Sequence, residues 1–218
     1  MPEDPKPDAP QPEATSPETP KPAPPPAAAK PPAGAPPKPP APAPKAPAVM
    51  AVTPWEDDLT KLLADAFPGR ISEFSTYLGQ CFLICPPGSV PDIVDYLKRE
   101  CSFDYLVDIT AAHYPARAEE AFDLIYILYS FSRNVRIRVK TRLKDGESIE
   151  SVVWIHPTAN WLEREVFDMF GIRFANHPDL KRILMPDEWE GHPLRKDYSI
   201  LKMDNRWVQE NLGIESGQ

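Results

Sequence analysis

The stretch that decides the fold reads Phe122-Asp123-Leu124-Ile125-Tyr126-Ile127-Leu128-Tyr129-Ser130-Phe131, and it continues after a short turn as Val135-Arg136-Ile137-Arg138-Val139-Lys140-Thr141-Arg142-Leu143-Lys144. The first part is almost continuously apolar, as is typical of a central strand that is buried on both faces. The second part alternates strictly, so that one face packs inward and the other carries five cations. We therefore expect two neighbouring strands at the centre of a sheet.

A third strand is expected directly after these two. Asp145-Gly146 is a strong hairpin signal, and the apolar residues from Ser151 to Ile155 follow it. The three strands should therefore form an antiparallel meander. Its basic face has two interpretations: a solvated sheet surface, or a docking stripe for an acidic neighbouring protein.

Upstream, the pattern predicts two amphipathic helices and three more strands. Thr53 is suited to cap a helix with Pro54 at its first position, and Ser89 precedes a second helix that begins with Val90 and Pro91. Short strands are expected near residues 71–77, 80–85 and 104–110. The predicted fold class is α+β: a mixed or antiparallel sheet with amphipathic helices packed on it, followed by a C-terminal helix and a long extended arm.

The N-terminal segment differs from the rest in composition. Residues 1–54 hold most of the 30 prolines, which predicts an extended or disordered tail. Its five lysines balance five acids, so the net charge of −8 lies on the remainder and disfavours a general nucleic-acid binder. We expect three regions: a tail over 1–54, an α+β domain over 55–156, and a helix with a partner-binding arm over 157–218.

Neither membrane insertion nor secretion is indicated by the sequence. It has no apolar run of transmembrane length and no signal-peptide pattern, so a cytosol-facing protein is expected. The three cysteines, Cys81, Cys85 and Cys101, include no Cys-x-x-Cys pair. We interpret them as buried, reduced thiols.

The segment from Asn160 to Gly171 predicts a helix of about three turns, with Asn160 as N-cap and Gly171 just beyond its end. On a helical projection Arg164, Glu165 and Asp168 share the face opposite the apolar one. Glu163 falls among aromatic residues, where an unpaired carboxylate is costly. Either it closes a capping box, or it forms a buried ion pair with an arginine such as Arg164 or Arg195.

After Gly171 the chain loses regular periodicity and yet stays rich in apolar side chains. Phe174, Ile183, Leu184, Met185, Trp189 and Leu194 are accompanied by Arg182, Arg195 and Lys196. Aromatic and arginine side chains concentrate binding energy at protein interfaces, so this arm is interpreted as a protein-binding segment.

Two other functions are alternatives on the residues alone. Glu163, Asp168, His177, Asp179 and His192 are of the types that bind metals or transfer protons, which would suit a metal-dependent enzyme. Their spacing matches no His-x-x-x-His, Glu-x-x-His or nucleophile-elbow motif. An adaptor recruited through the Pro-rich tail is the other alternative.

Four motifs in the C-terminal third carry a resemblance to a known family. They are Trp161-Leu162-Glu163-Arg164-Glu165, Phe167-Asp168-Met169-Phe170-Gly171-Ile172, His177-Pro178-Asp179-Leu180 with Arg182-Ile183-Leu184, and Gly191-His192-Pro193-Leu194-Arg195-Lys196-Asp197-Tyr198. Together they resemble the C subunit of respiratory NADH-quinone oxidoreductase, complex I. A looser similarity extends from Trp55 through the predicted sheet.

The resemblance implies a non-catalytic component of the peripheral arm, without catalytic, cofactor or metal residues of its own. It would pack against the D subunit, which helps to form the quinone site, near the B and I subunits, on the cytoplasmic side of the bacterial inner membrane. FMN and iron–sulfur clusters would be held by other subunits, which pass electrons from NADH to quinone with proton translocation. The alternative that the resemblance leaves open is the equivalent subunit of a ferredoxin-dependent complex or of a membrane-bound hydrogenase, in which related modules occur. The expected partner-binding or structural residues are Glu163, Arg164, Glu165, Asp168, His177, Arg182, Trp189, His192, Arg195, Lys196 and Asp197.

Overall fold

The structure is a computed structural model that describes residues 51–117, 119–199 and 205–213. The predicted tail lies almost entirely outside these residues. The described elements are β1 (Thr53–Pro54), α1 (Asp58–Ala66), β2 (Glu73–Tyr77), β3 (Gln80–Ile84), the 3-10 helix η1 (Pro87–Ser89), α2 (Val90–Arg99), β4 (Tyr105–His113), β5 (Phe122–Ser130), β6 (Val135–Leu143), β7 (Ser148–Glu150), α3 (Ala159–Phe170), β8 (Arg173–Ala175) and α4 (Asn205–Leu212).

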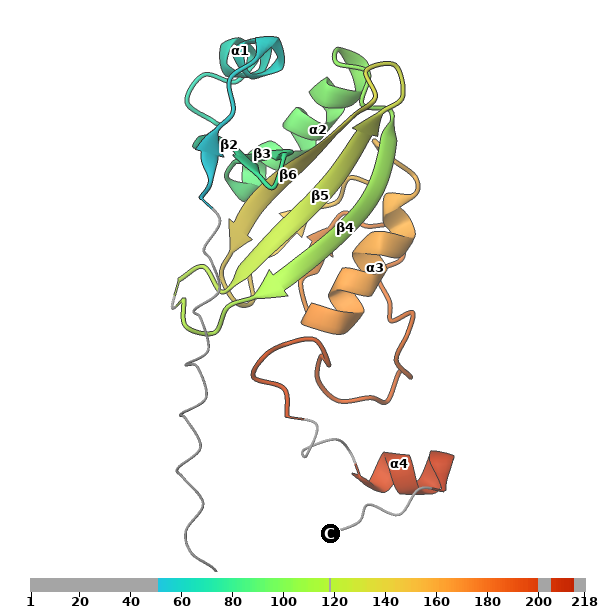
Figure 1. Cartoon of the computed structure of the whole chain (residues 1–218). Coiled ribbons are helices and arrows are strands. Elements are labelled where there is room, and N and C mark those ends of the chain that lie inside the picture. Colours follow the sequence, from blue (N-terminus) through green and yellow to red (C-terminus); the bar gives the residue numbers. More distant parts are fainter. Residues whose placement is uncertain (1–50, 118, 200–204, 214–218) are drawn as a thin grey trace, which may run out of the picture. The chain divides into compact units, whose positions relative to one another are not determined.

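A six-stranded mixed sheet organises the domain, with strand order β1-β2-β3-β6-β5-β4 (Figure 1). The neighbouring strands are antiparallel except for β3 and β6, which run parallel. Strands β7 and β8 form a separate parallel pair. The α+β class is therefore confirmed, and strands β2 to β6 lie where the sequence pattern predicts them. How the chain divides into domains stays a prediction.

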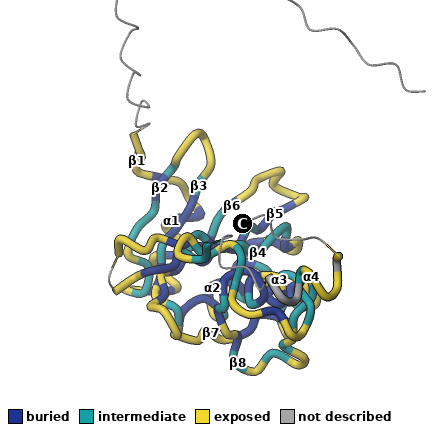
Figure 2. The backbone as a smooth tube through the Cα atoms, turned by 90° about the horizontal axis from the view of Figure 1, so that it is seen from below, coloured by how far each residue is buried: buried dark blue, intermediate teal, exposed yellow. Residues whose placement is uncertain are grey.

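The hydrophobic core lies on one face of this sheet. Leu124, Tyr126 and Leu128 of β5 are fully buried in the same cluster as side chains from α1, α2 and α3. In Figure 2 the buried stretches gather in the interior, whereas the turns between strands are exposed. Successive strand residues alternate between the faces, so Ile125 and Ile127 point the other way and are only half-buried. The prediction that β5 is buried on both faces is wrong, because these three helices all pack on the same side.

The first helix begins later than the sequence pattern suggests. Asp57, and not Thr53, is the N-cap of α1, and its Oδ1 accepts the Thr60 amide at 2.9 Å. The hydroxyl of Thr60 accepts the Asp57 amide at 3.0 Å, which completes a capping box. Thr53 and Pro54 instead pair with β2 as the short edge strand β1.

The predicted three-stranded meander is also wrong in its last strand. Strands β5 and β6 pair as expected, but the chain after Gly146 forms β7, which pairs with β8. Residues 151–155 form no strand because their backbone donors are used elsewhere. The Ser151 amide binds the Ala175 carbonyl at 2.9 Å, and the Val152 amide binds Glu163 Oε1 at 2.8 Å.

Candidate partner-binding site

The candidate site consists of helix α3 and of residues 176–198. We call residues 176–198 the arm. The helix begins at Ala159 after Thr158, whose side chain makes no capping hydrogen bond, so Asn160 is not the N-cap. Its other end is as predicted: Gly171 has a left-handed φ of +81° and its amide binds the Phe167 carbonyl at 2.9 Å. The arm does not extend away from the domain but folds back over α3 and the end of the sheet.

Asp168 holds the arm on the helix. Its side chain is fully buried, and its Oδ2 accepts hydrogen bonds from three successive amides, those of Ile183, Leu184 and Met185, at 2.8–3.0 Å. Successive amides that converge in this way form an anion-binding nest. Burial alone would raise the pKa of Asp168, but these bonds and the Arg182 guanidinium outweigh it and hold the pKa below its ordinary value. The carboxylate therefore stays ionised inside the protein.

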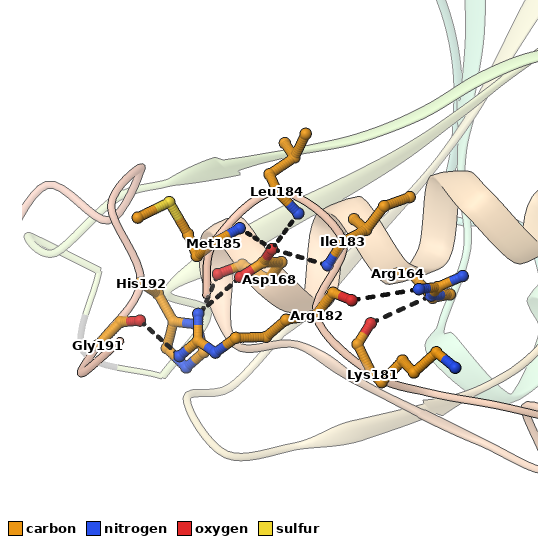
Figure 3. A network of polar contacts seen from close by, with 9 residues as sticks. All are labelled: Arg164, Asp168, Lys181, Arg182, Ile183, Leu184, Met185, Gly191 and His192. Atoms are coloured by element: carbon orange, nitrogen blue, oxygen red, sulfur yellow. Dashed lines mark hydrogen bonds and ion pairs between the residues drawn. The ribbon is translucent and has the colours of Figure 1, made fainter. Parts of the chain in front are cut away.

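Two arginines extend this network, as Figure 3 shows. Arg182 donates to Asp168 Oδ1 at 2.6 Å and to the Gly191 carbonyl at 2.9 Å, so it ties two parts of the arm together. Arg164 reaches out from the helix and donates to the carbonyls of Lys181 and Arg182, each at 3.2 Å. Asp168, Arg164 and Arg182 thus each have charged or backbone partners in this network.

His192 and Gly171 make the next contact between helix and arm. His192 Nδ1 lies 2.9 Å from the Asp168 carbonyl oxygen, and the Leu194 amide donates to the Met169 carbonyl at 3.1 Å. The last carbonyls of α3 are therefore satisfied by the arm. A Cβ on Gly171 would lie 2.7 Å from the His192 ring, so only glycine allows this approach.

We expect Gly171→Ala to lower the free energy of unfolding by about 2 kcal/mol, because it combines a left-handed alanine with a clash against His192. Gly69→Ala is the matched control, since Gly69 has φ +70° but no neighbour within 4 Å of the added Cβ. It should cost about 1 kcal/mol. Urea unfolding of both variants measures the difference. Equal losses would show that the contact with His192 contributes nothing.

Glu163 has partners other than those foreseen. Ser151 Oγ donates to its Oε2 at 2.7 Å and the Val152 amide to its Oε1 at 2.8 Å. It therefore closes no capping box and pairs with neither Arg164 nor Arg195, so both sequence-based interpretations are wrong. Burial raises the pKa of Glu163 to about 7, although the bonds from Ser151 and Val152 oppose this shift.

His177, which follows α3 in the chain, packs against the side of α3 that carries Glu163. Its Nε2 is 3.9 Å from Glu163 Oε2 and 3.2 Å from the Asn160 carbonyl oxygen. Its Nδ1 accepts the Asp179 amide at 3.1 Å, so Nε2 carries the proton and donates it to the Asn160 carbonyl. His177 thereby fixes the turn through which the chain enters the arm.

Arg195 fastens the far part of the arm to the end of the sheet. Its two terminal nitrogens lie 2.9 and 2.7 Å from the oxygens of Asp145, and its Nε lies 3.2 Å from Asp197. Hydrogen bonds from Arg195 lower the pKa of both carboxyls. The Lys196 amide donates to Nδ1 of the buried His113 at 2.9 Å, so Lys196 binds the sheet through its backbone.

The remaining predicted residues have different surroundings. Trp189 is buried by this chain itself and Met185 packs on its core, so both hold the arm in place. Glu165 is exposed.

Three residues of the site were not predicted from the sequence. Ser151 binds Glu163 of α3, Asp145 binds Arg195 of the arm, and His113 binds the Lys196 amide of the arm. Of these three, only Asp145 stands in a recognisable sequence pattern, the Asp145-Gly146 pair, and that pattern predicts a turn.

Several large apolar side chains near the arm stay exposed. Trp161 and Leu184 are each 61% exposed, and Arg164 lies over the Trp161 ring at 5.0 Å from its centre. Trp154 is also exposed, and its indole nitrogen donates to the Asn176 carbonyl at 3.3 Å. Trp154 thus contacts the turn at Asn176, and the carbonyl of Asn160, which precedes Trp161, contacts His177 in the same turn. Exposed tryptophan beside arginine is the composition that protein interfaces favour.

A membrane-spanning helix and a metal site are two other features that a chain of this kind could contain. No helix among them has the length and apolar character that crossing a membrane requires. In the same part of the chain, no group of three or more His, Cys, Asp and Glu side chains is arranged to hold a metal ion. Both oxygens of Asp168 are already taken by four donors of this chain.

Comparison with known proteins gives a consistent result. The family described as the respiratory-chain NADH dehydrogenase 30 Kd subunit matches residues 83–203. The C subunit of NADH-quinone oxidoreductase from Trichlorobacter lovleyi is 42% identical over 139 residues, which are 63% of this chain and 86% of that protein. Its counterpart from Geobacter sulfurreducens is 40% identical over the same shares of the two chains.

A solved structure shares the fold. One chain of the membrane-bound sulfane sulfur reductase, an archaeal respiratory membrane complex, superposes with a TM-score of 0.59 and 24% identity, over 73% of this chain and 92% of that one. At this identity the likeness concerns the fold alone. The family match, in contrast, spans more than half of the chain, so the chain belongs to the family of the respiratory-chain NADH dehydrogenase 30 Kd subunit and is the C subunit of an NADH-quinone oxidoreductase, complex I.

Proposed function

We propose that this protein is a non-catalytic component of complex I and that it joins the other subunits through α3 and the arm. Its chief partner in this proposal is the D subunit, which helps to form the quinone site, with the B and I subunits as neighbours. The protein is then held on the cytoplasmic side of the bacterial inner membrane by these partners. Electrons from NADH pass through FMN and iron–sulfur clusters bound elsewhere in the complex to quinone, coupled to proton translocation.

The observation that carries the proposal is an exposed apolar surface on a rigid support. Leu184 donates its amide to Asp168, so the backbone that carries its exposed side chain is held in one position by a buried carboxylate. Trp161 stands on the same helix and is covered on one side by Arg164. Side chains that are already fixed lose little conformational entropy on binding, which favours their use as contact residues.

The state of two cysteines supports the proposal that other subunits hold the iron–sulfur clusters. Burial raises the pKa of Cys85 to about 12, and it raises the pKa of Cys101 above its ordinary value. Iron–sulfur clusters bind thiolates, whereas burial favours the thiol form of these two side chains in the folded chain. They act as small core side chains beside α2 and β6.

We expect Trp161→Ala to reduce co-purification with the other subunits at least tenfold while leaving this chain folded, because the side chain is mostly exposed. Leu62→Ala on α1 is the control, since Leu62 is also exposed but lies on another helix. The measurement is the amount of the D subunit that co-purifies with the tagged variant from gently solubilised membranes. Full recovery of the complex by Trp161→Ala would refute this contact.

A further inference from the structure

A second surface lies at the opposite end of the sheet from the arm. The arm contacts His113 at the end of β4 and Asp145 just after β6. The start of β4, the end of β5 and the start of β6 lie about 27 Å away along strands of nine residues. The face turned away from the core carries there a group that we call the aromatic–arginine face: Tyr77, Tyr105, Tyr129, Phe131, Arg136 and Arg138.

Strand register places Tyr105, Tyr129 and Arg136 in one row across the sheet. Tyr105 of β4 is paired with Tyr129 of β5, and Tyr129 is paired with Arg136 of β6. Residues that are paired in this way point to the same face. Arg138 donates to the Gln80 side chain of β3, and Gln80 is paired with Tyr77 of β2. The aromatic–arginine face therefore crosses five strands, and none of α1, α2 and α3 packs on it.

The aromatic rings of this face are ordered and yet accessible. The Phe131 ring lies 4.9 Å from that of Tyr129 and 5.7 Å from that of Tyr105. Phe131 is 65% exposed and Tyr105 is 47% exposed. The Tyr129 hydroxyl donates to Asn134 Oδ1 at 2.6 Å, which fixes the turn that carries Phe131. An exposed apolar group that is held rigid in this way marks a contact surface.

The two arginines of the aromatic–arginine face lack a carboxylate partner. Among the described residues, no Asp or Glu oxygen lies within 4.0 Å of Arg136 or Arg138, whereas Arg142 further along β6 pairs with Glu120 at 3.0 Å. Arg136 also borders a hollow of about 360 Å³ with Gln80, Tyr129, Asn134 and Val135, and none of the residues lining it is acidic. Neither arginine is therefore neutralised by a direct ion pair, and Asp108 of β4, on the same face, is separated from Arg138 by Ile127 of β5.

We propose that the aromatic–arginine face binds an acidic segment of another protein of the complex, with a carboxylate paired to Arg136 or Arg138 and an apolar side chain against Phe131. The chain as a whole carries −8, so this local positive charge selects a partner of complementary charge. Tyrosine and arginine are the residues in which binding energy concentrates at protein interfaces.

Other occupants fit the face less well. In a symmetric pair of copies the same arginines would face each other and repel. Anionic membranes attract clusters of about four to eight cations. On this face of β6, Arg142 is paired with Glu120 and Lys140 lies over the Phe82 ring, which leaves the two arginines of the aromatic–arginine face. The chain's own residues 3–18 contain five acids and one lysine, so they are the strongest competitor and must be distinguished by experiment.

The test uses the full chain within its assembled complex. The photoreactive amino acid p-benzoyl-phenylalanine replaces Phe131, and in a control strain it replaces the exposed Leu62 of α1. Crosslinked peptides are identified by mass spectrometry. We expect one segment of another subunit that contains Asp or Glu, at a yield at least tenfold above the Leu62 control.

Charge variants then test the chemistry. Arg136→Glu with Arg138→Glu should reduce this crosslink at least tenfold, whereas reversing the exposed Arg173 of β8 should not change it. Reversing the partner's carboxylate to lysine should restore the crosslink to the Glu variant. Should the double Glu variant fail to fold, Arg136→Gln with Arg138→Gln replaces it, with an expected loss of at least threefold.

Several results would overturn the proposal: no crosslink above the control, or a crosslink to lipid, to a second copy, to residues 3–18, or to a segment without carboxylates. Retention of the crosslink in both charge variants would do the same. The surface is separate from Trp161 and the arm, so either proposal can fail while the other stands. Loss of the D subunit with Trp161→Ala but not with the arginine variants would separate them.

Discussion

Replacing Asp168 by alanine is expected to release the arm and to lower the free energy of unfolding by about 3 kcal/mol. The substitution leaves the largely buried Arg182 without its carboxylate and three successive amides without their acceptor. Removing one partner of a buried ion pair lowers the free energy of unfolding by about 3–5 kcal/mol. We take the lower end because the Arg182 side chain is 15% exposed.

Urea unfolding at pH 7 and limited proteolysis measure the two consequences. Cleavage should appear between residues 181 and 192 in Asp168→Ala but not in the unsubstituted protein. Asp179→Ala is the control, because Asp179 forms an exposed pair with Lys181 on the same arm. It should be indistinguishable from the unsubstituted protein. An Asp168→Ala protein with unchanged stability and an intact arm would contradict the role given to the nest.

The same network sets a pH dependence. The pKa of Asp168 is lower in the folded protein than its ordinary value of 3.8, so the contribution of the carboxylate is present above about pH 4. It is lost as the pH falls through the folded pKa. The difference in stability between Asp168→Ala and the unsubstituted protein should therefore narrow below about pH 4.

Glu163→Gln is expected to stabilise the protein at pH 8 and to leave it nearly unchanged at pH 4. The pKa of Glu163 rises from 4.5 to about 7 on folding, so the unfolded chain releases this proton first as the pH increases. Stability is therefore full below pH 4.5, falls between 4.5 and 7, and is lowest above 7. At about 1.4 kcal/mol per pH unit the gain of the glutamine variant at pH 8 is of the order of 3 kcal/mol.

Glutamine can keep the local hydrogen bonds. Its carbonyl oxygen accepts the Val152 amide, and its amide group can donate to the Ser151 hydroxyl, which rotates to accept. Denaturant unfolding at pH 4, 6 and 8 measures the difference, with Glu165→Gln on the exposed side of the same helix as control. A glutamine variant that loses stability with pH as steeply as the unsubstituted protein would show that Glu163 does not titrate in this range.

The sheet followed from the sequence because its signals are local. The alternation of apolar and polar residues from Val135 to Leu143 directly predicts a strand with one buried face, and β6 has these bounds. The first helix was misplaced because Pro54 suggested a start, whereas the actual start depends on how Asp57 and Thr60 bond to each other. The last strand was misplaced because Gly146 turns the chain toward β8 and not back along β6.

The site was only partly foreseen, since its bonds join residues that are far apart in sequence. Helical periodicity correctly separates Asp168 from the apolar face of α3, but nothing in it says that the arm covers that side. The amides that bind Asp168 follow 15 to 17 residues later, and their role depends on backbone direction and not on side-chain type. Glu163 was assigned to arginines because its true partners, Ser151 and Val152, carry no charge.

The single parallel pair in the sheet has a consequence for how the domain folds. Strands β1 to β3 and strands β4 to β6 are each joined by antiparallel contacts, and only β3 against β6 unites the two groups. Fifty residues, 85–134, separate the end of β3 from the start of β6. Each half can form from short-range contacts, but joining them requires closure of this long loop, which slows folding. We therefore expect the pairing of β3 with β6 to be the slow step of folding, which a stopped-flow refolding rate unchanged by weakening this pair would contradict.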